Sequence, residues 1–177
     1  MWKETPVFLE DLQTLSGQSF VPWEELRGKT VLVTGATGLI GYALVCGLLY
    51  AGAARELGLQ VIAAVRDDAR ARAKFEGPLG EGLPLRFVEG TVEELPPVEG
   101  PVDYIVHGAS PTAGKFFTEH PAATIETAVL GTRRLLQLAR EKKARGFVYL
   151  SSMETYGYPP AGTKCTEEMS GGLNTLE

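Results

Sequence analysis

The stretch from Thr30 to Gly41 places the strongest constraint on the fold of this chain. It reads TVLVTGATGLIG: a run of β-branched and apolar residues, three glycines at three-residue spacing, and then an apolar segment. The first glycine permits a tight turn, the second lets backbone approach a diphosphate, and the third lets a helix pack closely on the strand. A strand, a glycine turn and a helix in this order indicate a dinucleotide-binding unit, the alternative being a merely close turn.

The same alternation of strand and helix continues along the chain. Short apolar runs predict strands, and longer periodic segments predict helices at 39–50, 67–75 and 121–143; the strands are expected at 30–34, 60–65, 85–88, 102–106 and 146–151. Apolar strands that alternate with helices are typical of a parallel sheet covered on both faces. With right-handed crossovers, this predicts a doubly wound, Rossmann-type α/β sheet with strand order 3-2-1-4-5.

The two ends of the chain are expected to lie outside this sheet. Residues 1–28 predict an N-terminal extension with a short helix, because apolar side chains recur at helical spacing at Phe8, Leu9, Leu12 and Leu15. We expect this helix to lie as a strap on the domain surface; a partner-binding helix is the alternative. Residues 29–157 form the expected cofactor-binding domain. Residues 158–177 are rich in Gly and Pro, which favours an irregular tail that leads to an absent substrate-binding part.

Composition excludes several other classes of protein. The chain has 177 residues, room for one ordinary domain, and 17 basic against 22 acidic residues give a net charge of −5. An acidic chain is not expected to bind nucleic acid. Two cysteines and two histidines predict neither a metal site nor a disulfide framework. Residues 30–54 are uncharged but divided by five glycines, so we expect no membrane span. With no signal peptide, the expected location is the cytoplasm.

The residues after the second predicted strand bear on the choice of cofactor. An acidic residue at this point hydrogen-bonds the adenosine ribose of NAD, whereas an arginine pairs with the 2′-phosphate of NADP. Here Val65 is followed by Arg66 and Asp67, so both are candidates. We predict NAD or NADP as cofactor and favour NADP because of Arg66. The alternative is that Arg66 belongs to a solvated basic helix start.

Four motifs in order give the chain a resemblance to a known family. They are TGATGLIG at 34–41, HGASP at 107–111, VLGT at 129–132 and SSMETYG at 151–157. Together they resemble the extended short-chain dehydrogenase/reductases, the NAD-dependent epimerase/dehydratases of nucleotide sugars, over residues 29–157. The HGASP segment is similar to the UDP-glucuronate decarboxylase branch.

The resemblance implies a set of cofactor-binding residues. The pyrophosphate is expected on the glycine turn, at Gly35, Ala36, Thr37, Gly38, Leu39, Ile40 and Gly41. The nicotinamide side of the site is expected at Gly108, Ala109, Ser110 and Ser151. The family commonly holds adenine with an Asp and a branched residue after the third strand. Those positions are Thr91 and Val92 here, which suggests that backbone groups hold the adenine instead.

Two further residues match catalytic positions of the family. Ser152 falls where the family has a Ser or Thr that hydrogen-bonds the substrate oxygen being oxidised. Its alternative role is a strand-end hydroxyl that caps backbone. Glu154 falls where dehydratases and decarboxylases carry a Glu for acid/base chemistry, although a structural role is equally open. Met153 stands where dehydratases have an Asp, which weakens the match to that branch.

The family's catalytic Tyr-x-x-x-Lys pair has no counterpart, since none of the six tyrosines has a lysine four residues on. The resemblance therefore implies the N-terminal part of a longer enzyme, inactive alone, whose full-length form acts on a nucleotide sugar as an epimerase, dehydratase or decarboxylase. An NADPH-dependent carbonyl reductase and a non-catalytic dinucleotide-sensing module are the alternatives. Because the family often dimerises through its long helices, we expect a homo-oligomer.

Overall fold

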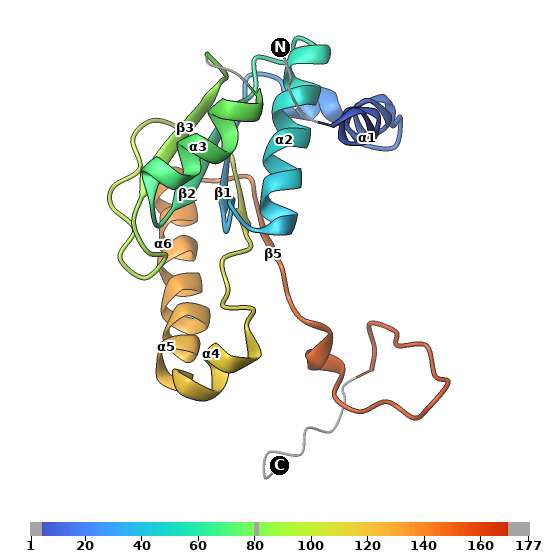
Figure 1. The fold of residues 1–177 in the computed structure, drawn as a ribbon, viewed down its shortest axis with the longest axis vertical. Helices are drawn as coiled ribbons and strands as arrows, with labels where there is room; N and C mark the ends of the chain where they lie inside the picture. The colour runs from blue at the N-terminus through green and yellow to red at the C-terminus, as the bar shows by residue number, and fades with distance from the viewer. Residues whose placement is uncertain (1–4, 80–81, 170–177) are drawn as a thin grey trace.

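The computed structural model describes residues 5–79 and 82–169, and its centre is a parallel sheet (Figure 1). The five strands lie in the order β3-β2-β1-β4-β5, which confirms the predicted topology. Their bounds are β1 Thr30–Thr34, β2 Gln60–Val65, β3 Leu85–Glu89, β4 Tyr104–His107 and β5 Gly146–Tyr149. The fourth strand begins and ends later than predicted, and the fifth ends two residues earlier. Because all neighbouring strands pair in parallel, their five carboxyl ends lie at the same edge of the sheet.

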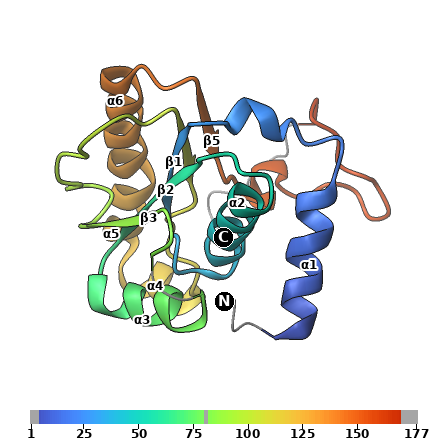
Figure 2. The ribbon, with the colours of Figure 1, turned by 90° about the horizontal axis from the view of Figure 1, so that it is seen from above.

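Helices cover both faces of the sheet (Figure 2). One side carries α1 Pro6–Gly17, α2 Leu39–Ala54 and α3 Asp68–Leu79, with the short turn η1 Trp23–Leu26 before β1. The other side carries one long helical segment, composed of α5 Pro121–Glu126, η2 Thr127–Gly131 and α6 Thr132–Lys142 and preceded by α4 Gly114–Glu119. No described helix is long and apolar enough to cross a membrane.

Each face of the sheet has its own hydrophobic core. Val31 and Val33 of β1 point to the side of α1, α2 and α3, where Phe75 is fully buried. Leu32, between them, points to the opposite side and packs with Leu135 of α6. Alternate residues of a strand face opposite sides of a sheet, so a strand covered on both sides must be apolar throughout. This explains the unbroken TVLVT run of β1.

The N-terminal helix α1 packs on α2. Leu12 is buried in the core shared with α2, and a Cβ built on Gly47 would lie 2.7 Å from Leu15 Cδ2, so the two helices approach closely there. At the C-terminal end of α1, Arg55 Nε donates a hydrogen bond to the Ser16 carbonyl at 2.7 Å, and Trp23 Nε1 donates to the Gln18 carbonyl at 3.2 Å. Leu12, Leu15 and the Arg55 hydrogen bond hold α1 against α2, and the Trp23 hydrogen bond ties the segment after α1 back to its end.

The helix predicted at 121–143 differs from its expected form. Its middle, η2, is a π-helical turn, which holds one extra residue and rotates all later side chains by roughly 100°. Helical spacing in the sequence predicts one apolar face that includes Ile125, Val129, Leu135 and Leu136. Instead Leu135 is buried, whereas Ile125, Val129 and Leu136 are each at least half exposed. The predicted apolar face was therefore wrong for these three residues.

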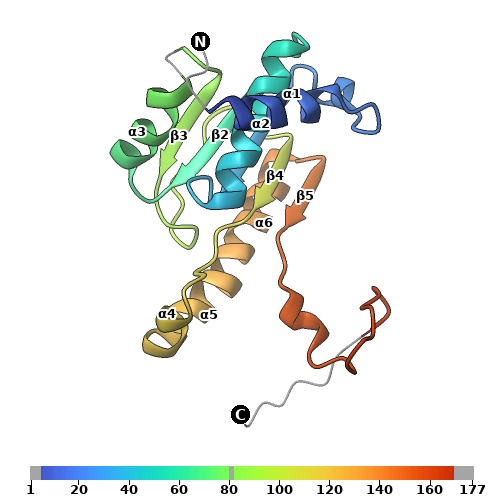
Figure 3. The ribbon, with the colours of Figure 1, turned by 45° about the vertical axis from the view of Figure 1, so that its right-hand side comes forward.

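The segment after β5 leads away from the sheet, as the orange-to-red ribbon in Figure 3 shows. Apart from the short turn η3 Met153–Tyr156, it has no helix or strand up to residue 169. The described part of the predicted tail is residues 158–169. The rest of the predicted tail, residues 170–177, lies outside the described residues.

Candidate functional site

The candidate site lies at the carboxyl edge of the sheet, between β1 and β4. From β1 the chain crosses to β2 on one side, whereas β4 pairs with β1 on its other side. Where the strand order reverses in this way, the loops after the two central strands diverge to opposite faces and leave a crevice for a ligand. The glycine turn after β1 and the segment from Gly108 to Ser110 after β4 both lie there.

The glycine turn is built on backbone contacts that exclude side chains. Gly35 has φ +69°, and a Cβ added to it would lie 2.5 Å from the Gly108 carbonyl oxygen. A Cβ on Gly41 would lie 2.1 Å from the Gly35 carbonyl oxygen. The first contact joins the two loops, and the second brings the first turn of α2 onto the glycine turn. Both approaches leave backbone, without side chains, lining the crevice.

The N-terminus of α2 follows this glycine turn directly and has no side-chain cap. Gly38 is its N-cap residue and supplies no side-chain hydrogen bond to the first turn. The first backbone N–H groups of a helix lack intrahelical partners and carry the positive end of the helix dipole, so an uncapped end suits a phosphate. Leu39 and Ile40, in this first turn, are 90% and 65% exposed. Apolar side chains so exposed are typical of a surface that meets a ligand or another segment.

Lys74 of α3 contacts the glycine turn, and sequence reasoning missed it. Its Nζ donates a hydrogen bond to the Thr37 carbonyl at 2.7 Å and lies 4.8 Å from the ring centroid of Tyr42. The ammonium is thus held against the turn by a hydrogen bond and a cation–π contact. A lysine on the helix after the second strand was visible in the sequence, but nothing local indicated where its side chain would reach.

The two candidates after β2 have different surroundings. Arg66 is exposed. Asp67 Oδ1 accepts a hydrogen bond from the Arg70 backbone N–H at 2.8 Å, so this carboxylate caps the first turn of α3. The cap occupies part of the acceptor capacity that a ribose would need. Arg66 is therefore the freer of the two to meet a cofactor.

The candidates after β3 are Thr91 and Val92. Thr91 Oγ1 accepts from the Glu94 backbone N–H at 3.2 Å, which fixes the turn. The Val92 side chain is buried against the helix, where a Cβ on Gly131 would lie 2.6 Å from its Cγ2. Val92 therefore contributes to the core, and its backbone is what remains for a ligand.

Glu93, next to these residues, is a charged group that the sequence did not single out. Burial raises the pKa of its carboxyl, but hydrogen bonds from Thr127 and Thr91 and the positive charge of Arg66 outweigh burial, so the pKa lies below the ordinary value. The Thr127 hydroxyl donates directly to Glu93 Oε1. An ionised carboxylate therefore stands between the end of β3 and the π turn.

The candidates after β4 are tied to β1. The backbone N–H groups of Gly108 and Ala109 donate to Thr34 Oγ1 at 3.2 and 3.1 Å. Thr34 is the last residue of β1, so one hydroxyl joins the two loops that flank the crevice. The Ser110 hydroxyl is exposed and donates to the Pro111 carbonyl at 3.1 Å.

The candidates after β5, Ser151, Ser152 and Glu154, are all exposed. Ser152 Oγ accepts from the Glu154 backbone N–H at 3.4 Å and caps the turn η3. This is the structural role that the sequence left open beside the catalytic one. No group of His, Cys, Asp and Glu suited to a metal ion occurs among residues 5–79 and 82–169.

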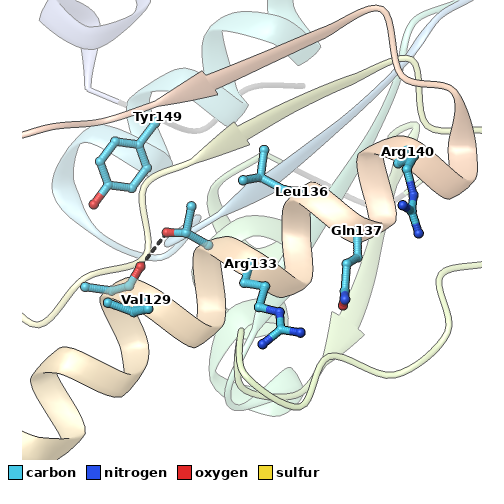
Figure 4. A pocket seen from close by; sticks show the side chains of 8 residues that line it. Val129, Arg133, Leu136, Gln137, Arg140 and Tyr149 are labelled. Carbon is cyan, nitrogen blue, oxygen red and sulfur yellow. Dashed lines mark hydrogen bonds between the residues drawn. The ribbon is translucent and has the colours of Figure 1, made fainter.

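A shallow groove lies apart from the glycine turn, between α6 and β5. Its lining is mainly helical: Ala128, Val129, Thr132, Arg133, Leu136, Gln137, Arg140 and, from β5, Tyr149. Figure 4 shows Leu136 and Tyr149 projecting toward the space between helix and strand, with Arg133 and Gln137 turned away from it. The groove therefore has an apolar floor and a charged outer side.

A doubly wound parallel sheet with a glycine turn and an open helix N-terminus at its switch point defines a dinucleotide-binding Rossmann protein. The chain belongs to the NAD dependent epimerase/dehydratase family, whose sequence profile matches residues 31–175. The match covers most of the chain and confirms the family to which the four motifs pointed.

Individual relatives have related activities. A dTDP-glucose 4,6-dehydratase of Streptomyces antibioticus is 32% identical over 130 residues, 72% of this chain and 38% of the dehydratase. UDP-glucuronic acid decarboxylase 6 of Arabidopsis thaliana is 31% identical over 146 residues, 82% of this chain and 40% of the decarboxylase. The structure is similar to that of DesIV, a dTDP-glucose 4,6-dehydratase from Streptomyces venezuelae with NAD and TYD bound, at 30% identity and TM-score 0.65, covering 82% of this chain and 46% of DesIV. The chain thus spans less than half the length of these relatives.

Proposed function

We propose that this chain binds NAD or NADP and supplies the cofactor-binding part of an enzyme that acts on a nucleotide sugar. The observation that carries the proposal is the close approach of the Gly35 and Gly108 backbone at the carboxyl ends of β1 and β4, next to the uncapped N-terminus of α2. These residues suit a diphosphate. Glycine at positions 35, 38 and 41 leaves the turn without bulky side chains, and the first N–H groups of α2 follow it directly. Lys74 adds a full positive charge at the same turn.

The cofactor, when bound, accepts and returns a hydride at the sugar carbon. The chain's own proposed part is to hold the diphosphate on the glycine turn and the nicotinamide side against Gly108, Ala109 and Ser110. In this proposal the Ser152 hydroxyl leaves its capping contact and hydrogen-bonds the substrate oxygen. Glu154, exposed two residues later, serves as the acid or base after oxidation.

We further propose that Arg66 gives a preference for NADP. In calorimetric titrations, NADP is expected to bind more tightly than NAD, and Arg66→Ala is expected to weaken NADP binding about tenfold, since a charge-assisted contact to an exposed arginine contributes roughly 1–2 kcal/mol. NAD lacks the 2′-phosphate, so its affinity is expected to stay the same. Arg70→Ala, on the exposed face of α3, is the matched control. A wild type that prefers NAD, together with an Arg66→Ala variant that changes nothing, contradicts the NADP preference.

We also propose that the chain self-associates through the exposed apolar side chains of α5, η2, α6 and β5. These include Ile125, Val129, Leu136 and Tyr149, each about half exposed or more. Val129, Leu136 and Tyr149 line one groove, and exposed apolar surface of this kind favours association. Light scattering is expected to give a mass above that of one chain, and Leu136→Asp is expected to lower it to one chain. Phe20→Asp, which changes an exposed phenylalanine beyond α1, is expected to leave the mass unchanged; a monomeric wild type contradicts the proposal.

A further inference from the structure

His107, the last residue of β4, is 1% exposed and lies at the centre of the candidate site. In the sheet it stands beside Thr34 of β1, its register partner. Its two ring nitrogens each contact a threonine hydroxyl: Nδ1 lies 2.7 Å from Thr34 Oγ1, and Nε2 lies 3.1 Å from Thr132 Oγ1. A buried imidazole with two hydroxyl partners has a proton position that the neighbouring hydrogen bonds determine.

The Thr34 side fixes the protonation of Nδ1. Thr34 Oγ1 already accepts hydrogen bonds from the Ala109 backbone N–H and from the Gly108 backbone N–H, which it shares with the Thr34 carbonyl. A hydroxyl has two acceptor lone pairs and a single proton, so both lone pairs are used and the proton remains to be donated. Its recipient is His107 Nδ1, which must therefore be unprotonated.

The Thr132 side fixes Nε2 independently. The Thr132 backbone N–H donates to the Val129 carbonyl, within the π turn, and the Thr132 hydroxyl donates to the Ala128 carbonyl at 2.6 Å. Because the single proton of this hydroxyl is donated to the Ala128 carbonyl, the oxygen can only accept a hydrogen bond from His107. His107 Nε2 therefore carries the hydrogen. Both sides thus require the same neutral tautomer, with the proton on Nε2.

The chain of hydrogen bonds joins three parts of the site. Thr34 directly precedes Gly35, the first residue of the glycine turn, and Gly35 packs on the Gly108 backbone. Thr34 Oγ1 accepts hydrogen bonds from the backbone N–H groups of Gly108 and Ala109. Ala128 belongs to the π turn η2, and Thr132 is the first residue of α6. His107 is the one side chain among the described residues through which these three parts are hydrogen-bonded in series.

We propose that His107 is a positioning residue, locked as the neutral Nε2–H tautomer, which holds the glycine turn and the Gly108–Ala109 segment in the geometry that binds the cofactor, and that protonating His107 releases this segment. A protonated ring donates from Nδ1, so Thr34 Oγ1 would face three donors with two lone pairs. The Gly108 amide keeps the Thr34 carbonyl as an acceptor, so the Ala109 amide is the group that loses its hydrogen bond. The part of the proposal that concerns cofactor affinity rests on the proposed function.

The groups around the ring favour the neutral form. Burial lowers the pKa of His107 below its ordinary value, and the negative charge of Glu93, after β3, opposes this in part. Phe147 and Tyr149 of β5 lie with ring centroids 6.4 and 5.4 Å away. The unfolded chain binds more protons below about pH 6.5, the ordinary histidine value. The free energy of unfolding therefore falls as the pH drops from there toward the native pKa.

Long-range nitrogen–proton NMR correlations on the cofactor-free protein test the tautomer. We expect His107 to be neutral at pH 7 with the proton on Nε2. We also expect the amide signals of Gly108 and Ala109 to shift together with the ring when it titrates. A proton on Nδ1, a charged ring at pH 7, or Gly108 and Ala109 amide signals that do not shift when the ring titrates would each overturn the proposal. This measurement needs no cofactor.

The consequence for binding is tested with NAD titrations between about pH 5 and pH 8, the range in which histidine changes charge. If only the neutral form binds, the apparent Kd rises tenfold per pH unit below the native pKa. His107→Gln, which does not titrate, is expected to give a flat profile, whereas His120→Gln, which replaces the exposed histidine, is expected to keep the wild-type profile. Identical profiles for wild type and His107→Gln overturn the proposal. If NAD binds at no pH, the proposed function fails, and the NMR titration decides the positioning role.

Discussion

Replacing Gly35 by alanine is expected to abolish measurable NAD binding and to lower the free energy of unfolding by about 2–5 kcal/mol, from left-handed backbone strain and overpacking together. Gly35 has φ +69°, which disfavours any side chain, and its Cβ would lie 2.5 Å from the Gly108 carbonyl oxygen and 2.9 Å from the Ala109 nitrogen. Both neighbours are backbone, so the overlap is relieved only by moving the two loops apart. Calorimetric NAD titration and chemical denaturation measure the two effects.

Gly28→Ala is the matched control for this experiment. Gly28 has nearly the same backbone angle, φ +65°, but nothing lies within 4 Å of where its Cβ would be. The change is expected to cost only the left-handed backbone strain, about 1–2 kcal/mol, and to leave NAD affinity unchanged. The difference between the two variants isolates the contact between the loops. Equal losses of stability, with NAD binding retained in both, would show that the contact plays no part in binding.

The elements around Gly35 could be predicted because the relevant rules are local. A strand covered on both faces must be apolar throughout, so TVLVT and QVIAAV identified β1 and β2 to the residue. Three glycines at three-residue spacing can meet backbone contacts only in a tight strand–helix turn, and the structure shows such contacts at Gly35 and Gly41. Right-handed crossovers then left one sheet order, which the structure confirms.

The parts of the site that could not be predicted depend on contacts distant in sequence. The π turn at Thr127–Gly131 has no local marker in the sequence. The hydrogen bond between Thr34 and His107 joins residues 73 apart. Asp67 was a candidate for the ribose, but the helix that starts beside it uses its carboxylate as a cap. Such roles depend on which elements are neighbours in space, and the periodicity of a helix or strand does not reveal its tertiary neighbours.

Lys74 is another residue of this kind, and Lys74→Met is expected to weaken NAD binding at least tenfold. Its ammonium, half-buried on α3, is held at the glycine turn by the Thr37 carbonyl at 2.7 Å and by the ring of Tyr42. A unit charge about 5 Å from a phosphate gains roughly 1–3 kcal/mol at a partly screened site. Methionine keeps the apolar stem and removes the charge, so calorimetric titration of NAD reports the charge itself.

Three comparisons separate a phosphate contact from mere support of the turn. Lys74→Arg keeps the charge and is expected to retain most of the affinity, and Lys115→Met, at an exposed lysine of α4, is expected to change nothing. The loss in Lys74→Met is expected to shrink as salt is raised from about 0.1 M to 1 M, because the screening length falls from roughly 10 Å to 3 Å. Adenosine has no phosphate, so its affinity is expected to be the same in wild type and Lys74→Met. If adenosine binding weakens as much as NAD binding, Lys74 acts by shaping the Thr37 turn, and its charge does not meet the cofactor.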